Sequence, residues 1–211
     1  MSGPGELSAI LLAGGRASRV QGAVKPLFVV GGTTLLRTAV EAVRDAGAHR
    51  VTVVGSVLDE RLDVEWVREE PPFGGPAAAV VAALRTWPEK GAAEWTILLA
   101  CDLPRAADAV RRLVADAALV PPDTDGVCLA DRTSRPQWLT GIYRTRALRR
   151  AASALPGAGR DLPVRALVDD LALAVVVDHE GVTDDVDTWE DLERARARIP
   201  GTSARAPKES S

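Results

Sequence analysis

Near the start of the chain stands the stretch Leu11-Leu12-Ala13-Gly14-Gly15-Arg16-Ala17-Ser18-Arg19, which continues as Val20-Gln21-Gly22-Ala23-Val24-Lys25. The apolar run that leads into it, residues 7–12, is long enough for one buried strand. Two adjacent glycines allow the backbone to approach a ligand closely, and backbone N–H groups turned into such a loop bind anions. Arg16, Arg19 and Lys25 add positive charge, so the loop suits a polyphosphate such as that of a nucleotide. An ordinary surface turn is the alternative.

Two better-known phosphate-binding loops are excluded by the spacing of these glycines. The chain has no G-x-x-x-x-G-K-[ST], and the residues from Gly14 to Arg19 do not form G-x-G-x-x-G. The second absence also argues against an oxidoreductase that binds a nicotinamide dinucleotide. A phosphate site in this loop is therefore of another kind.

The composition is that of one globular domain rather than of a nucleic-acid or membrane binder. The chain has 211 residues, 46% of them hydrophobic, and 26 Lys and Arg against 29 Asp and Glu give a net charge of -3. No apolar run reaches membrane-spanning length, no signal peptide is visible, and Cys101 and Cys128 do not make a disulfide framework. We expect a cytoplasmic, monomeric protein with one domain over residues 1–200 and a disordered tail over residues 201–211.

Strands and helices alternate along the chain, as they do in three-layer α/β domains with a mainly parallel sheet. Thr33 and Thr34 can cap the first helix, and Gly47 can end it. The periodicity predicts strands over residues 50–55, 64–68, 95–100, 125–130, 137–143 and 172–178, and further helices over residues 77–84, 110–117, 146–155 and 162–171. We expect one antiparallel strand, from the later half of the chain.

Asp102 follows the most apolar predicted strand, in the sequence Cys101-Asp102-Leu103-Pro104. Ligands of open α/β sheets bind outside the carboxyl ends of the strands, so Asp102 lies where a ligand is expected. The carboxylate there either caps the next helix or holds Mg²⁺, which prefers one or two carboxylates together with phosphate and water oxygens.

The glycine loop and its surroundings resemble the signature of a nucleotidyltransferase family that includes molybdenum cofactor guanylyltransferase. The matching residues are Leu-Ala-Gly-Gly at 12–15, Arg19, Gly22, Lys25-Pro26 and Cys-Asp-Leu-Pro at 101–104. The similarity extends to about Ala197 and implies a Rossmann-like domain that transfers GMP from GTP to the terminal phosphate of molybdopterin, releasing pyrophosphate. It also implies Mg²⁺ as cofactor, and molybdenum-insertion proteins or molybdoenzyme chaperones as partners.

The family's functional residues fall on several parts of this chain. By resemblance, the catalytic residues are Arg19, Lys25 and Asp102. The same resemblance assigns nucleotide binding to Leu12, Ala13, Gly14, Gly15, Lys25, Glu70, Gly75 and Asp102, and metal binding to Asp102 and Asp187. Gly75 precedes a helix that begins at Pro76, and the N-terminus of such a helix favours anions. Glu70 takes the acidic position that precedes this glycine segment in the family.

The acidic segment from Thr183 to Leu192 admits two interpretations. Thr188 and Asp191 match the capping box of a helix. The segment also resembles the closing motif of the family, with Asp185 and Asp187 in place of two Asn residues. That resemblance places Asp187 or Asp185 beside the metal.

The chain departs from the family pattern at Val20, Gln21 and Val24, where Met, Gly and Asp are usual. Gly14 favours guanine, because the cytidylyl enzymes of the family tend to carry Ala at that position. Three alternatives stay open: cytidylyl transfer to molybdopterin, nucleotidyl transfer to a sugar phosphate, and a weakly active nucleotide-binding homologue that serves as a partner protein.

Overall fold

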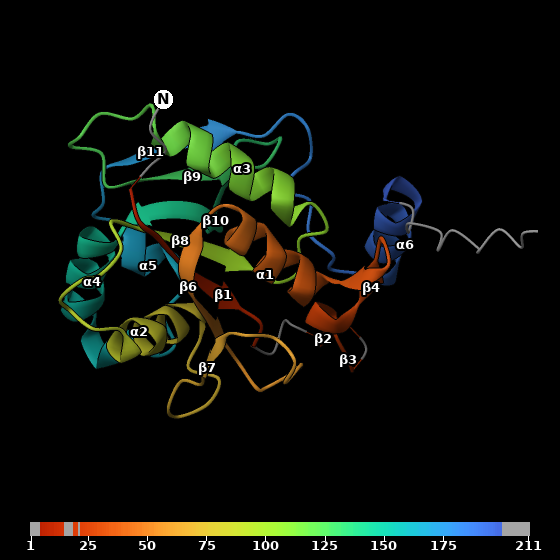
Figure 1. The fold of residues 1–211 in the computed structure, drawn as a ribbon, viewed down its shortest axis with the longest axis horizontal. Helices are drawn as coiled ribbons and strands as arrows, with labels where there is room; N and C mark the ends of the chain where they lie inside the picture. Colours follow the sequence, from red (N-terminus) through yellow and green to blue (C-terminus); the bar gives the residue numbers. More distant parts are fainter. Residues whose placement is uncertain (1–4, 15–18, 21, 200–211) are drawn as a thin grey trace, which may run out of the picture.

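A seven-stranded sheet forms the centre of the computed structural model, which describes residues 5–14, 19, 20 and 22–199 (Figure 1). Its strands lie in the order β11-β9-β10-β8-β1-β6-β7. They are β1 (Leu7–Leu12), β6 (Ala48–Val54), β7 (Glu65–Val67), β8 (Trp95–Ala100), β9 (Gly126–Ala130), β10 (Pro136–Arg144) and β11 (Leu173–Val177). β10 runs antiparallel to β8 and β9, and the other neighbouring strands are parallel. The expected mainly parallel sheet with one antiparallel strand is confirmed.

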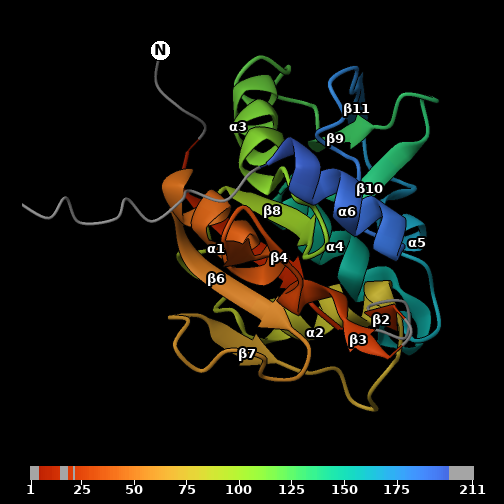
Figure 2. The ribbon, with the colours of Figure 1, turned by 90° about the vertical axis from the view of Figure 1, so that its right-hand side faces the viewer.

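Helices cover both faces of this sheet and make the expected three layers (Figures 1 and 2). α1 (Leu35–Asp45) and α3 (Ala106–Ala117) pack on one face, while α2 (Pro76–Thr86) and α4 (Thr145–Ala154) pack on the other. The strands serve both layers because successive side chains point to opposite faces. In β8, for example, Ile97 and Leu99 join the α1–α3 core, whereas Leu98 joins the α2–α4 core.

A third, smaller core lies at one end of the domain, where the chain brings distant segments together. Helix α6 (Trp189–Arg198) packs there against a hairpin of β4 (Val29–Val30) and β5 (Thr33–Thr34). Phe28, Val186 and Leu192 are among its buried residues. Figure 1 shows α6 beside β4, although most of the chain separates them in sequence. This third core therefore holds the segment before α6 against residues from the early part of the chain.

Short elements complete the described part of the chain. β2 (Arg19–Val20) pairs with β3 (Ala23–Val24), and a 3₁₀ turn, η2 (Lys25–Leu27), follows at once. A second such turn, η3 (Pro156–Gly159), precedes the short helix α5 (Arg165–Val168). Among the described residues no helix is long and apolar enough to cross a membrane.

The helix boundaries follow the predicted caps, with one exception. The side chain of Thr34 accepts a hydrogen bond from the Arg37 N–H at 3.2 Å, and Thr188 with Asp191 forms the capping box of α6. The helix predicted over residues 162–171 is reduced to α5, since Pro163 has no N–H to donate and the Leu162 N–H bonds to Gly159 in a turn. The tail predicted over residues 201–211 lies outside the described residues.

Candidate active site

A cavity of about 470 Å³ opens at the carboxyl ends of β1, β6 and β8. This is the edge of an open α/β sheet at which ligands bind. Its walls are formed by Leu12, Gly14, Lys25, Pro26, Val54, Glu69, Gly75, Pro76, Ala79, Ala100, Cys101, Asp102, Leu139, Asp185 and Asp187. Of the site residues predicted from the sequence, the cavity therefore brings together Leu12, Gly14, Lys25, Gly75, Asp102 and Asp187.

The start of the glycine loop is held against the end of β6. The Ala13 N–H donates to the Val54 carbonyl oxygen at 3.0 Å, and Ala13 is buried and is not among the residues that line the cavity. Gly14 is exposed, and a Cβ atom added to it would lie 3.2 Å from the Cα of Gly55. The absence of a side chain at Gly14 thus allows the chain after β1 and the chain after β6 to approach each other closely. Gly15 and the side chain of Arg19 lie outside the part of the chain that is described.

The second glycine segment forms the opposite wall. Gly75 caps α2 with a φ of 92°, in the left-handed region that favours glycine, and Pro76 begins the helix. A Cβ at Gly75 would also approach the Leu162 carbonyl oxygen to 3.3 Å. The N-terminus of an eleven-residue helix, α2, therefore faces the cavity, where its free N–H groups favour an anion.

The acidic residue of this wall is Glu69 and not Glu70. Glu69 is half-buried and lines the cavity, whereas Glu70 is exposed and is not among the lining residues. The Phe73 N–H donates to Glu69 Oε1 at 3.0 Å, which holds the carboxylate against the backbone of its own loop. Neighbouring residues in extended backbone point in opposite directions, so a shift of one residue exchanges inside for outside.

Three aspartates converge beside this cavity. One oxygen from each of Asp102, Asp185 and Asp187 lies within 4.8 Å of the other two. Asp102 follows β8, and the other two precede α6. The Val186 N–H donates to the Asp102 carbonyl oxygen at 3.0 Å, and the Val186 side chain is fully buried in the third core. Val186 thus anchors the segment so that its two acidic neighbours stay at the cavity.

Lys25 is the basic group of this cluster. It is 4% exposed, lies in η2, and forms an ion pair with Asp187. Burial, then the charge of Asp185, raises the pKa of Asp102 to about 6 against the opposing effect of Lys25. Burial and the charge of Asp187 also raise the pKa of Asp185. One described cation stands against three carboxylates, so the cluster favours a further cation.

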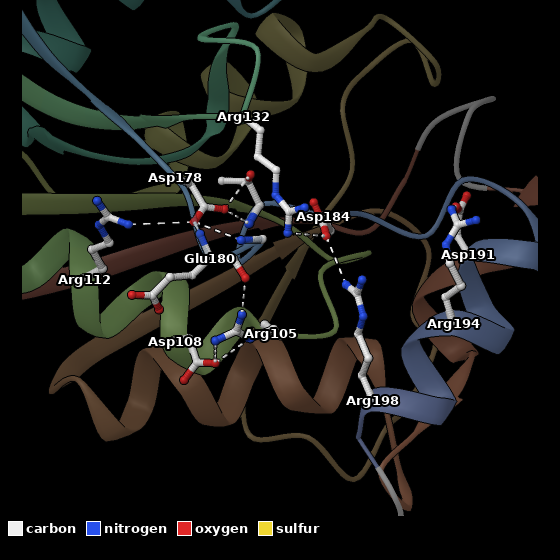
Figure 3. A network of polar contacts seen from close by, with 12 residues as sticks. Arg105, Asp108, Arg112, Arg132, Asp178, Glu180, Asp184, Asp191, Arg194 and Arg198 are labelled. Atoms are coloured by element: carbon white, nitrogen blue, oxygen red, sulfur yellow. Dashed lines mark hydrogen bonds and ion pairs between the residues drawn. The ribbon is translucent and has the colours of Figure 1, made fainter.

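The segment that carries Asp185 and Asp187 is held in place by a buried carboxylate (Figure 3). Asp178 is fully buried and accepts hydrogen bonds from the N–H groups of Glu180 at 2.8 Å, Gly181 at 3.1 Å and Thr183 at 2.8 Å. Arg105 on the α3 side donates to the Glu180 carbonyl oxygen at 2.7 Å. Burial alone would raise the pKa of Asp178, but these hydrogen bonds outweigh it and lower that pKa.

Sequence reasoning missed Asp178, Glu69 and Leu139. An Asp that ends a strand and is followed by Gly181 within three residues is typical of a turn closed by its side chain, and this signal points to Asp178. No pattern in the sequence separates Glu69 from Glu70. Leu139 enters the cavity wall from the antiparallel strand β10, a placement that only the tertiary structure provides.

Comparison with known proteins identifies the family and the fold of the chain. Residues 9–178 match the family model of the MobA-like NTP transferase domain. Two curated relatives match part of the chain. A probable molybdenum cofactor guanylyltransferase of Opitutus terrae is 37% identical over 101 residues, which are 46% of this chain and 48% of that protein. A putative molybdenum cofactor guanylyltransferase of Neisseria meningitidis serogroup B is 30% identical over 105 residues, 46% of this chain and 52% of that protein.

A solved structure shows the same fold over nearly the whole chain. It is a nucleotidyl transferase from Methanothermobacter thermautotroptrophicus, with a TM-score of 0.68 and 21% identity. The comparison covers 92% of this chain and 97% of that one. The matches to the curated relatives, in contrast, span only about half the length of each relative.

Proposed function

The chain belongs to the MobA-like NTP transferase family, and we propose that it transfers GMP from GTP to the terminal phosphate of molybdopterin with the help of Mg²⁺. One observation carries this proposal: a buried lysine and three aspartates share a cavity with the glycine loop at the carboxyl ends of parallel strands. The guanylyltransferase names of both curated relatives support the choice of nucleotide and acceptor.

In the proposed reaction an oxygen of the acceptor phosphate attacks the α-phosphorus of GTP. The new P–O bond forms while the bond to the bridging oxygen breaks, and that oxygen leaves with pyrophosphate. The chain's own residues position the reactants and stabilise charge, so no covalent protein intermediate is needed. Gly14 allows the phosphates to lie close to the backbone, Lys25 supplies a positive charge, and the N-terminus of α2 adds a partial one.

The remaining walls suit the base and sugar. Leu12, Val54 and Ala79 supply apolar surface on which a flat ring can pack. The Glu69 carboxylate in the same wall accepts hydrogen bonds only, and the N1–H and amino groups of guanine are donors. This pairing of acceptor and donors supports a guanine nucleotide.

The three aspartates fit Mg²⁺. Carboxylate oxygens are the ligands that this ion prefers, and Asp102, Asp185 and Asp187 offer them from within 4.8 Å of one another. Mg²⁺ bound there would neutralise charge that develops on the phosphates. Asp184, next in the chain to Asp185, is exposed, forms an ion pair with Arg198 at 3.3 Å, and is not part of the cluster. It therefore provides a matched control.

The first test is the thermal stability of the protein with GTP, CTP, ATP or UTP, each with and without Mg²⁺. A ligand that binds only the folded state raises its stability, by about 2.7 kcal/mol at a concentration of 100 Kd. We expect GTP to stabilise the protein selectively and Mg²⁺ to strengthen the effect. Transfer is then measured with α-labelled GTP and molybdopterin; Asp102→Asn should abolish the labelled product, and Asp184→Asn should retain it.

Three other results of these assays would favour a different function. Preferential stabilisation by CTP would replace the proposal with cytidylyl transfer to molybdopterin. Selective GTP binding with transfer only to a sugar phosphate would change the acceptor. Stabilisation by no nucleotide would overturn the enzymatic proposal and favour a partner protein.

A further inference from the structure

The ion pair between Lys25 and Asp187 joins two side chains to which the proposed function assigns different ligands. Lys25 is 4% exposed, and Asp187 is the partner that the structure gives its ammonium group. Both residues line the same cavity. The proposed function needs Lys25 at the nucleotide phosphates and Asp187 at the metal, so the pair joins two groups that are to act separately.

In this arrangement an ammonium group lies against the carboxylates that would bind the metal ion. The ammonium group of Lys25 contacts one member of the three-aspartate cluster, whose oxygens lie within 4.8 Å of each other. A divalent cation entering this cluster would lie close to that ammonium group and repel it, because like charges at such short range in a partly buried site interact strongly. The two cations therefore compete for the same carboxylates.

We propose that Lys25 occupies the place of the metal in the metal-free protein and is released toward the nucleotide when the metal binds. The inference rests on the proposed function for the identity of the site and adds a coupling between its two ligands. The backbone of Lys25 needs no movement, since its carbonyl oxygen is held by the Phe28 N–H at 2.9 Å and Pro26 is buried next to it. Only the flexible four-carbon side chain changes its position.

This exchange makes the binding of metal and of nucleotide mutually favourable. A metal ion that binds without nucleotide must displace Lys25 from Asp187. This displacement lowers the apparent affinity of the cluster for the metal. When triphosphate is also present, the released ammonium group gains a new partner, so each ligand strengthens the binding of the other by the same factor. The binding of either ligand thus affects both Lys25, near the start of the chain, and Asp187, near its end.

The test is a titration with Mn²⁺ alone, in which free Mn²⁺ is measured by electron paramagnetic resonance, followed by competition with Mg²⁺. Lys25→Met keeps a long unbranched side chain and removes the competing charge, so we expect it to bind Mn²⁺ at least about tenfold more tightly than the wild type. The same variant should bind GTP more weakly. A merely structural role for Lys25 would weaken both ligands and would not tighten either one.

Two further variants serve as controls. Lys25→Arg keeps the charge, so its Mn²⁺ affinity should stay within about twofold of the wild type. Lys90→Met removes the same charge from an exposed position that precedes β8, at the opposite end of that strand from Asp102, and it should also leave the affinity unchanged. Thermal melts of each variant establish that it is folded.

The remaining outcomes separate this inference from the function on which it rests. Equal or weaker Mn²⁺ binding by folded Lys25→Met, with a wild type that binds the ion, would overturn the exchange and leave the nucleotidyltransferase proposal standing. Failure of the wild type and of every variant to bind Mn²⁺ would overturn the exchange together with the metal assignment.

Discussion

Asp178 accepts hydrogen bonds from both the backbone N–H and the side-chain O–H of Thr183, at 2.8 and 2.9 Å. This pair closes the turn that leads from β11 to the two acidic residues before α6. Since Asp178 is fully buried, its carboxylate cannot exchange these partners for water. The geometry of the three-aspartate cluster therefore depends on a residue that does not belong to it.

Replacement of Asp178 by Ala should lower the free energy of unfolding by about 3 kcal/mol. The change leaves several buried N–H groups without an acceptor, and hydrogen bonds to a charged group contribute more than neutral ones. Urea denaturation measures the difference. Asp123→Ala, which removes an exposed carboxylate, should change it by less than about 0.5 kcal/mol. Equal stability of the two variants would contradict the structural role of Asp178.

The stabilisation by Asp178 should depend on pH in the acidic range. Its folded-state pKa lies below the ordinary value of 3.8, so the unfolded chain binds the proton first as pH falls. The contribution of Asp178 is therefore complete well above this unfolded pKa of 3.8 and is lost as pH falls toward the lower folded pKa. Urea denaturation between pH 3 and 7 should show a constant difference between the wild type and Asp178→Asn above about pH 5, and a smaller one at about pH 3. A difference that grows on acidification would contradict this assignment.

Replacement of Asp102 by Asn should stabilise the metal-free protein at alkaline pH while it abolishes transfer. The folded-state pKa of Asp102 is raised to about 6, mainly by burial, so the ionised form is disfavoured in the folded protein. Asp102 therefore makes the folded protein more stable below pH 3.8, where its carboxyl group is protonated, than at alkaline pH. This extra stability is lost as the pH rises through about 6. We expect Asn to gain about 3 kcal/mol at pH 8 and less than about 1 kcal/mol at pH 4.

Thermal melts in EDTA at pH 8 and pH 4 test this expectation. The control is Asp184→Asn, whose exposed carboxylate should have little effect at either pH. Addition of Mg²⁺ should raise the melting temperature of the wild type and of this control, but not that of Asp102→Asn. If Asp102→Asn melted at a lower temperature than the wild type in EDTA at pH 8, the ionised Asp102 carboxylate would not destabilise the metal-free fold.

Replacement of Gly14 by Ala should weaken the binding of GTP more than that of CTP. The added Cβ would lie 3.2 Å from the Cα of Gly55, so the loop or the end of β6 must shift by a few tenths of an ångström. We expect a loss of about threefold or more in GTP affinity, roughly 0.7 kcal/mol. Calorimetric titration with both nucleotides measures the change, and the CTP affinity serves as the internal reference. An unchanged ratio of the two affinities would remove Gly14 from the determinants of base preference.

Much of the fold is predictable because its signals are local. The apolar strands, the cap at Thr34 and the capping box at Thr188 each depend on neighbouring residues in the sequence, and the structure confirms them. The placement of Asp102 at a cavity also follows from a local pattern, since an apolar strand ends there and strand ends of a parallel sheet meet at one edge.

The rest of the site depends on relations that no local pattern contains. Glu69 and Glu70 have the same chemistry, and only the path of the loop decides which one faces the cavity. Asp185 joins Asp187 in the cluster because Val186 is buried between them, in a core that forms only when α6 packs on the β4–β5 hairpin. The short α5 likewise reflects turns that compete with a favourable apolar spacing.

The pair of Lys25 and Asp187, separated by 162 residues, also determines when the site can exist. Protein synthesis proceeds from the N-terminus, and the earlier parts of a chain leave the ribosome first. The glycine loop and its lysine therefore emerge well before the aspartates that follow β11. A nascent chain that ends before Asp187 lacks one carboxylate of the three-aspartate cluster and the partner of Lys25. The proposed transfer can therefore begin only after translation has passed this aspartate and α6 has docked.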